Sequence, residues 1–278
     1  AHRAVHTAIP TALVGGAILT ILGVAFSETF LIWMGTPSDV LPLSALYMKI
    51  YFGGIIFMMI YNFCASILRA TGDTKSPLIF LTIAGFINVV LNVIFVTIFD
   101  LNVAGVALAT TISQGVSAIL VVLALVKRSD ACQLHFSQLK FYKDEFLQIL
   151  KIGLPAGIQG SLFSISNVII QSSINSFGSA VMSGNAATLN IEGFIYIVLN
   201  AFHQTTLNFT GQNVGANNYR RAKKVFIICL LCVFVIGITL SLTMYLLGPQ
   251  LLSIYITDSQ EAIECGLLRM SCLFIPYF

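Results

Sequence analysis

Apolar residues run through this chain in long stretches that polar residues interrupt at short intervals. Each stretch reaches about 20 residues or more, the length that crosses roughly 30 Å of hydrocarbon. The connectors carry turn formers such as Thr71-Gly72-Asp73, and Gly248-Pro249 can end the seventh stretch near Leu247. The pattern predicts eight membrane-spanning helices, near residues 8–33, 45–66, 77–99, 103–126, 150–176, 182–208, 225–256 and 262–278.

The composition supports a membrane location. Hydrophobic residues make up 57% of the chain and charged residues 9%, against roughly 45–50% and about 25% in soluble domains. The formal net charge of +3 is too small to predict a nucleic-acid partner. We therefore expect a multi-pass protein of a cell membrane, with the bacterial cytoplasmic membrane as the expected location and the lipid bilayer as its surroundings.

Basic residues gather in alternate connectors. They precede the first span and follow the second, fourth and sixth spans, as at Arg69, Lys127 and Arg220. The other connectors, around 35–44, 100–102, 177–181 and 257–261, hold no Lys or Arg. Because cytoplasmic loops collect Lys and Arg, this alternation predicts an even number of spans and a cytoplasmic N-terminal end.

An internal similarity links the beginning and the end of the chain. A basic segment and a long apolar span precede both residues 31–39 and residues 252–260, and another apolar span follows each. If this repeat is real, its unit is six spans long and the two halves have the same orientation. Identity between the copies is low, so a chance similarity stays the alternative.

The spans predict an all-α polytopic membrane protein, and the repeat extends this prediction. Its eight transmembrane helices would belong to a twelve-helix carrier with two parallel six-helix bundles, two helices preceding Ala1 and two following Phe278. The predicted division is an N-terminal bundle over 1–126, a cytoplasmic linker over 127–150 and a C-terminal bundle over 151–278. Within the linker, residues 142–150 have the pattern of an amphipathic surface helix.

Local motifs resemble one transporter family. The segment Ile67–Pro77 resembles the loop after the fourth helix of the multidrug and toxic compound extrusion (MATE) transporters, and residues 87–92 and 105–113 resemble their fifth and sixth helices. Gly153-Leu154-Pro155-Ala156-Gly157 resembles the opening of the seventh helix, and residues 211–216 resemble the loop after the eighth. The resemblance runs from the third to the tenth helix of the family, in order.

The resemblance implies a secondary antiporter. Such proteins expel organic cations and other small amphipathic compounds in exchange for protons or Na⁺, so the expected cofactor is none beyond the coupling ion, and a monomer is expected. One alternative is a lipid-linked oligosaccharide flippase of related fold, and another is a non-transporting scaffold or receptor. Flippase cavities tend to carry Arg and Lys, whereas here Lys49 lies near a loop end and Arg269 is isolated in the sequence.

The resemblance also implies an ion site in the first half. In related transporters an Asp of the first helix joins an Asn of the fourth, an Asn and an acidic residue of the fifth, and a Thr of the sixth. The matching positions here are Asn62, Asn88, Asn92 and Thr110. Asn92 stands where some members have Asp, and the family's first helix is not part of this sequence. Asn88 and Asn92 lie four apart on one helix face, and the plainer interpretation is interhelical hydrogen bonding.

A polar stripe marks the sixth span. Polar residues recur there every three or four positions, namely Asn185, Thr188, Glu192, Tyr196, Asn200 and His203, and the fifth span has Ser164, Asn167, Gln171 and Asn175. Such a stripe must face other helices or water. We predict that Glu192, Tyr196 and Asn200 line a cavity that binds substrate or ion.

Glu192 is the one acidic residue well inside an apolar span of the sequence, since Glu28 lies near a helix end. A central charge costs about 2.5–3.5 kcal/mol on insertion scales, so we expect Glu192 to exchange a proton or bind a cation. Many relatives place a Glu in the seventh helix, eight residues after the Pro of the Gly-Leu-Pro motif, where this chain has Phe163.

Enzyme motifs are missing from the sequence. It has no Gly-rich phosphate loop of the Walker type and no His, Cys and carboxylate cluster with metal-ligand spacing. No nucleophile has an evident base partner. We therefore predict that the protein is not an enzyme and holds no metal other than a coupling Na⁺.

Overall fold

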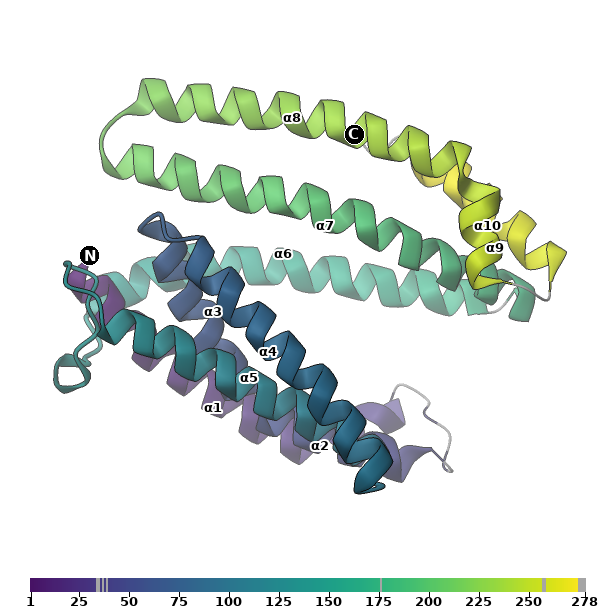
Figure 1. Cartoon of the computed structure of the whole chain (residues 1–278), viewed down its shortest axis with the longest axis horizontal. Coiled ribbons are helices and arrows are strands. Elements are labelled where there is room, and N and C mark those ends of the chain that lie inside the picture. Colours follow the sequence, from purple (N-terminus) through teal and green to yellow (C-terminus); the bar gives the residue numbers. More distant parts are fainter. Residues whose placement is uncertain (34–35, 37, 39, 176, 257–258, 275–278) are drawn as a thin grey trace. The chain divides into compact units, whose positions relative to one another are not determined.

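The structure, a computed structural model, describes all of the chain except residues 34–35, 37, 39, 176, 257–258 and 275–278. The described residues are mostly helical and include no strand (Figure 1). The α-helices are α1 (His2–Trp33), α2 (Leu41–Gly53), α3 (Ile55–Ala70), α4 (Lys75–Val93), α5 (Asn102–Val126), α6 (Lys143–Asn175), α7 (Ser179–Gly215), α8 (Tyr219–Leu246), α9 (Gly248–Tyr255) and α10 (Gln260–Phe274). The π-helix η1 (Ile94–Ile98) and the 3₁₀-helix η2 (Phe136–Gln138) complete the list.

The predicted all-α class is confirmed, and each predicted span coincides with a helix or with two consecutive helices. Within the described part of the chain, six segments are long and apolar enough to cross a membrane, namely 2–33, 41–70, 75–98, 102–126, 143–174 and 219–246. The sixth predicted span is α7, which has 37 residues but carries the polar stripe. The eighth is α10, with 15 described residues.

Glycine interrupts the second predicted span, which consists of α2 and α3 rather than one helix. Gly54 lies between them, and its N–H donates to the carbonyls of Ile50 and Tyr51. A Cβ at Gly54 would lie 2.7 Å from Oγ1 of Thr111 on α5, closer than real contacts allow. The absence of a Cβ at Gly54 therefore lets α5 approach, and the Thr111 hydroxyl donates to Ile50 O at 3.3 Å.

Proline helps to set the second interruption. Helix α8 ends at Leu246 and α9 begins at Gly248, with Pro249 in its first turn. Proline has no N–H to donate to the preceding turn, so a continuous helix is disfavoured here. The predicted end of the seventh stretch near Leu247 is confirmed.

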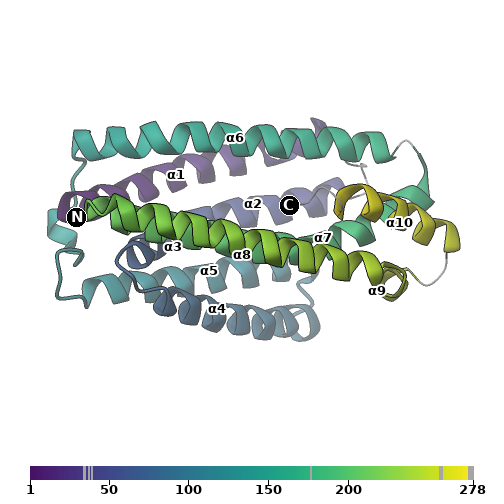
Figure 2. The same ribbon diagram turned by 90° about the horizontal axis from the view of Figure 1, so that it is seen from above.

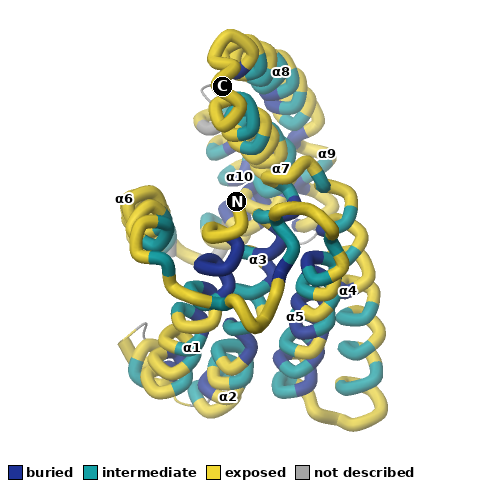
Figure 3. The backbone as a smooth tube through the Cα atoms, turned by 90° about the vertical axis from the view of Figure 1, so that its left-hand side faces the viewer, coloured by how far each residue is buried: buried dark blue, intermediate teal, exposed yellow. Residues whose placement is uncertain are grey.

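The chain divides into two compact units, residues 1–153 and 154–278. In the first unit α1 packs against α2 and α3, and α5 packs against α2, α3 and α4. Figure 3 shows buried residues in dark blue on α3 and α5. The core consists of Val5, Ile9, Tyr61, Cys64, Ala65, Leu68, Ala118, Val121, Leu125 and Leu134.

The segment between α5 and α6 is tied to the beginning of α1. The backbone N–H of His135 donates to Nε2 of the buried His6 at 3.1 Å. The N–H of Tyr142 donates to Oγ1 of Thr7 at 3.2 Å. Helix α6 then runs without interruption from Lys143, so the surface helix expected over 142–150 and the fifth span form one helix. The division into six-helix bundles stays a prediction.

In the second unit α7 lies beside α8 (Figures 1 and 2). Helix α7 also packs against α10. Helices α7 and α10 approach closely because Gly184 faces the backbone of Ala262 and Gly266. One turn further, Oγ1 of Thr188 lies 3.2 Å from Gly266 O. The core is formed by Ala187, Ile191, Ile195, Leu252, Ile256, Ala262 and Met270.

Large apolar side chains cover much of the exposed surface of these helices. Phe86 and Ile98 each expose 72% of their area, and Ile152 exposes 75%. Exposed apolar patches of this extent fit a surface that faces lipid. The internal repeat stays a prediction, and its residues Thr257 and Asp258 lie outside the described part of the chain.

We expect Gly184→Ala to destabilise the second unit. The new Cβ would lie 2.4 Å from Ala262 O and 2.9 Å from Gly266 N, and backbone atoms cannot move aside as a flexible side chain can. Overpacking of this kind costs typically about 1–3 kcal/mol. The thermal unfolding midpoint of the purified protein in detergent should fall.

Gly211→Ala on the same helix is the matched control. Nothing lies within 4 Å of a Cβ at Gly211, and alanine is better than glycine inside a helix by roughly 0.5–1 kcal/mol. Its midpoint should stay constant or rise. Equal midpoints for the two variants would contradict the close approach of α7 and α10.

Candidate functional site

An amide and hydroxyl cluster joins α4 to α5 in the first unit. Asn88 Nδ2 donates to Thr110 Oγ1 at 3.4 Å and to Ser113 Oγ at 3.3 Å. Asn92 Nδ2 donates to the side-chain and backbone oxygens of Asn88, both at 3.0 Å. We call Asn88, Asn92, Thr110 and Ser113 the amide cluster. Its helix α4 continues directly into the π-helix η1, a distortion that is frequent at functional sites.

Two buried acceptors in this region have no hydrogen-bond partner among the described residues. They are Oδ1 of Asn92 and Oε1 of Gln114. A buried carbonyl oxygen without a partner costs free energy, so each such atom in a native structure calls for an explanation. A cation or a water molecule would satisfy either oxygen.

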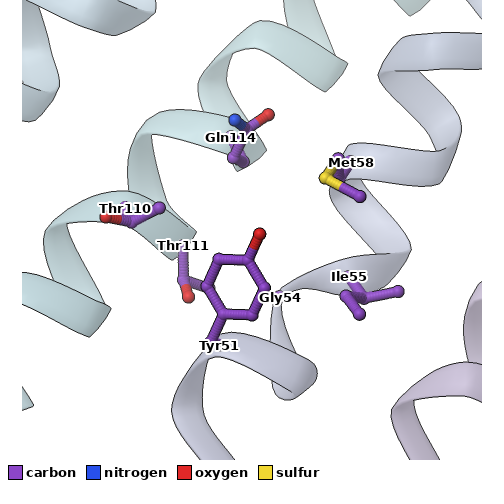
Figure 4. A pocket seen from close by; sticks show the side chains of 7 residues that line it. All are labelled: Tyr51, Gly54, Ile55, Met58, Thr110, Thr111 and Gln114. Carbon is purple, nitrogen blue, oxygen red and sulfur yellow. The ribbon is translucent and has the colours of Figure 1, made fainter. Parts of the chain in front are cut away.

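A small cavity lies where α2 breaks at Gly54. Its volume is about 30 Å³, and Figure 4 shows its lining residues, which include Tyr51, Thr110, Thr111 and Gln114. This volume is sufficient for a water-sized guest, which needs about 10–15 Å³ on this measure. Thr110 belongs both to the cavity lining and to the amide cluster. The sequence did not single out Gln114, although it lies four residues after Thr110 on α5.

The second unit contains a larger cavity, of about 490 Å³, between α6, α7 and α10. We call it the second-unit cavity. Its apolar lining is Phe163, Val168, Ile170, Ile174 and Leu189, and its polar lining is Asn167, Gln171, Glu192, Tyr196 and Arg269. Ligand pockets measure about 300–1,000 Å³ and combine a mostly apolar wall with a few polar groups.

An ion pair lies in the wall of the second-unit cavity. Nη2 of Arg269 on α10 is 3.4 Å from Oε2 of Glu192 on α7, and the two side chains expose 23% and 22% of their area. Arg269 is isolated in the sequence, but in the structure it has a partner on another helix. Helices α7 and α10 run side by side through the contacts of Gly184 and Thr188, and the next turn of each brings Glu192 and Arg269 together.

Comparisons with known proteins show the family of the chain. The family model described as MatE matches residues 1–94 and 155–278. The chain belongs to this family of transporters. The probable multidrug resistance protein YpnP of Bacillus subtilis is 30% identical over 258 residues, which are 92% of this chain and 57% of YpnP.

Other members support the same assignment. The multidrug export protein MepA of Staphylococcus aureus is 23% identical over 249 residues, covering 90% of this chain and 55% of MepA. A solved multidrug resistance MATE transporter in the outward-facing conformation has a TM-score of 0.88 at 20% identity, covering 99% of this chain and 61% of that one. The chain thus spans little more than half the length of the curated relatives it matches.

The position eight residues after the Pro of the Gly-Leu-Pro motif lies in the wall of the second-unit cavity. Its residue, Phe163, lines the same cavity as Glu192. The neighbouring helix α7 therefore brings a carboxylate to the cavity that Phe163 borders.

The polar stripe of the sixth span divides into three parts. Asn185 and Thr188 are buried, and Asn185 Nδ2 donates to Gln171 Oε1 at 2.9 Å. Glu192 and Tyr196 line the second-unit cavity. Asn200 and His203 are exposed and are not among the residues that line it. The side chain of Asn175 lies outside the described residues.

The residues predicted for the first-half site are only partly assembled. Asn88, Asn92 and Thr110 meet in the amide cluster. Asn62 on α3 is exposed, and no hydrogen bond of the described residues joins it to that cluster.

We expect Asn88→Ala to destabilise the first unit by about 1 kcal/mol. The substitution removes two interhelical hydrogen bonds, each worth roughly 0.6 kcal/mol in membrane proteins. Asn62→Ala is the control, and it should change stability by less than about 0.5 kcal/mol because the side chain is exposed. Thermal unfolding of both purified variants measures the difference, and equal losses would count against the cluster.

Proposed function

We propose that the protein is a secondary active antiporter that exports amphipathic organic compounds with a cationic group in exchange for H⁺ or Na⁺. The second-unit cavity carries this proposal, because it combines a volume of about 490 Å³, an apolar wall and the carboxylate of Glu192. The names of YpnP and MepA, which designate multidrug resistance and export, support a transport function over catalysis.

The chemistry of the cavity suits an amphipathic cation. Phe163, Leu189 and Ile174 can bury the apolar part of a compound, and Tyr196 adds an aromatic ring that attracts cations. Glu192 supplies the negative charge, and its half-buried position strengthens the attraction because little water screens it.

Exchange follows from competition at one carboxylate. Glu192 can hold a proton or the positive group of a substrate, and neither binds fully while the other is present. Proton binding from one side of the membrane therefore releases the substrate, and substrate binding releases the proton. Because of this competition, the proton and the substrate cross the membrane in opposite directions, and neither is transported without the other.

The amide cluster suits Na⁺ rather than a proton. Asn88, Asn92, Thr110 and Ser113 offer neutral oxygens, which are ligands for hard cations and do not titrate near neutral pH. The unpartnered Oδ1 of Asn92 is available as a ligand. We therefore propose Na⁺ binding at this cluster and proton binding at Glu192.

Two alternatives are kept as outcomes of the test. A flippase for lipid-linked oligosaccharides needs several cationic groups for a pyrophosphate. Among the described residues that line the second-unit cavity, Arg269 alone is cationic, and it is already paired with Glu192. A scaffold or receptor would use the polar stripe for packing alone and would export nothing.

Glu192→Gln should abolish or strongly reduce export of amphipathic cations. Glutamine keeps the shape and hydrogen bonding of the side chain but carries no charge, and Glu192→Asp should retain partial activity. Ethidium and several other cations are loaded into cells that express the complete gene. Their efflux is followed by fluorescence at external pH values from roughly 6 to 8, on both sides of neutrality.

Glu28→Gln is the matched control for this experiment. Glu28 forms an exposed pair with Lys49 at 3.7 Å and is not among the residues that line the cavity, so efflux should stay at the parental level. No efflux by the parent for any cation would exclude drug export. Full efflux by Glu192→Gln would make Glu192 a structural residue.

NaCl should raise the thermal unfolding midpoint of the purified protein, compared with KCl at equal ionic strength. A ligand that binds only the folded state stabilises it by mass action. Asn92→Ala removes the unpartnered oxygen and should abolish the Na⁺ effect, while Asn62→Ala should keep it. Equal midpoints of the parent in NaCl and KCl would exclude the Na⁺ site.

A further inference from the structure

Both signs of charge are present in the wall of one apolar cavity. Glu192 and Arg269 lie 3.4 Å apart and expose only 22% and 23% of their side chains. Amphipathic cations need the negative charge alone, so the guanidinium is not explained by their export.

When a compound with one positive charge binds, the cavity contains an unbalanced positive charge. When its cationic group takes the Glu192 carboxylate, Arg269 loses that partner in a half-buried setting. Removing one partner of a buried ion pair is strongly unfavourable, because the remaining charge keeps its desolvation cost. A compound that also carries an anionic group avoids this cost, since the anionic group pairs with Arg269.

Arg269 has space beside it for such a rearrangement. It lines a second cavity of about 400 Å³, which also includes Ile174, Val181 and Leu268. Ile174 and Arg269 belong to the walls of both cavities. The guanidinium can therefore separate from Glu192 without leaving the region that holds the compound.

We propose that the second-unit cavity selects zwitterionic amphipathic compounds. The cationic group pairs with Glu192, the anionic group pairs with Arg269, and the apolar body lies against Phe163 and Leu189. This inference rests on the proposed function, in that it takes the second-unit cavity as the site where exported compounds bind.

A matched pair of dyes tests the selection. A rhodamine with a free carboxylate is a zwitterion at neutral pH, and its methyl ester is a cation with the same ring system. Binding to the purified complete protein is measured by fluorescence anisotropy. We expect the parent to bind the free acid roughly tenfold more tightly than the ester, a difference that partial exposure of the pair limits.

Charge variants give a distinct pattern for each role. Arg269→Gln should reverse the preference, so that the ester binds more tightly than the acid. Glu192→Gln should weaken both rhodamines and increase the affinity for the anionic dye fluorescein, because Arg269 is then without its partner. The double variant should bind the acid and the ester equally. Lys49→Gln, which alters the exposed pair with Glu28, should leave the parental preference unchanged.

Arg269→Lys is the control that separates loss of the positive charge from loss of folding. It retains the positive charge and should retain the preference for the acid, and thermal unfolding identifies any variant that does not fold. Because the parent is measured first, equal binding of acid and ester by the parent overturns the inference without any variant.

Two failures are distinguishable. Equal binding of both rhodamines by the parent, with efflux of cations retained in cells, overturns zwitterion selection and leaves the cation export proposal standing. Absence of binding for every dye, together with absence of efflux in cells, overturns both. The inference is supported if the parent binds the ester more weakly than the acid and Arg269→Gln removes this difference or reverses it.

Discussion

The bilayer's lack of hydrogen-bonding solvent is the constraint on which the rest of this structure depends. Each N–H and C=O in hydrocarbon must find a partner inside the protein, and the helix provides one within the same segment. Where a helix stops, local groups replace the missing bonds, as the N–H of Gly54 does with two carbonyls of α2. Polar side chains obey the same rule, so the amide cluster and the Glu192–Arg269 pair occur where helices face each other.

Small residues convert this constraint into specific helix contacts. Lipid tails are as apolar as leucine, so spanning helices gain little from burying apolar area and associate by close packing instead. Gly184 lets the backbones of α7 and α10 approach, and Thr188 adds a hydroxyl contact to Gly266. Because the two helices continue in the same direction, the next turn sets Glu192 against Arg269. The position of the ion pair is thus a consequence of packing two turns away.

The amide cluster and the second-unit cavity differ in the charge of their polar groups. The amide cluster contains neutral oxygens and hydroxyls, which do not change charge in the physiological range. The second-unit cavity contains a carboxylate and a guanidinium within an apolar wall, where charge interactions are weakly screened. This contrast is the basis on which we propose a bound Na⁺ for the first unit and exchange of a proton with a charged compound for the second.

The sequence by itself determined the helical class, the approximate spans and the family, because apolar stretches of membrane length and ordered motifs are local patterns. It also singled out Asn88, Asn92 and Glu192, since polar residues are rare in apolar spans, and it added Thr110 through the resemblance to the family. Only the tertiary structure decided their partners. It joined Asn88 to Ser113, left Asn62 and Asn200 exposed, and paired Glu192 with Arg269, a residue 77 positions away. Such pairings depend on which helix faces come together in the folded protein. The spacing of residues along a single helix does not contain this information.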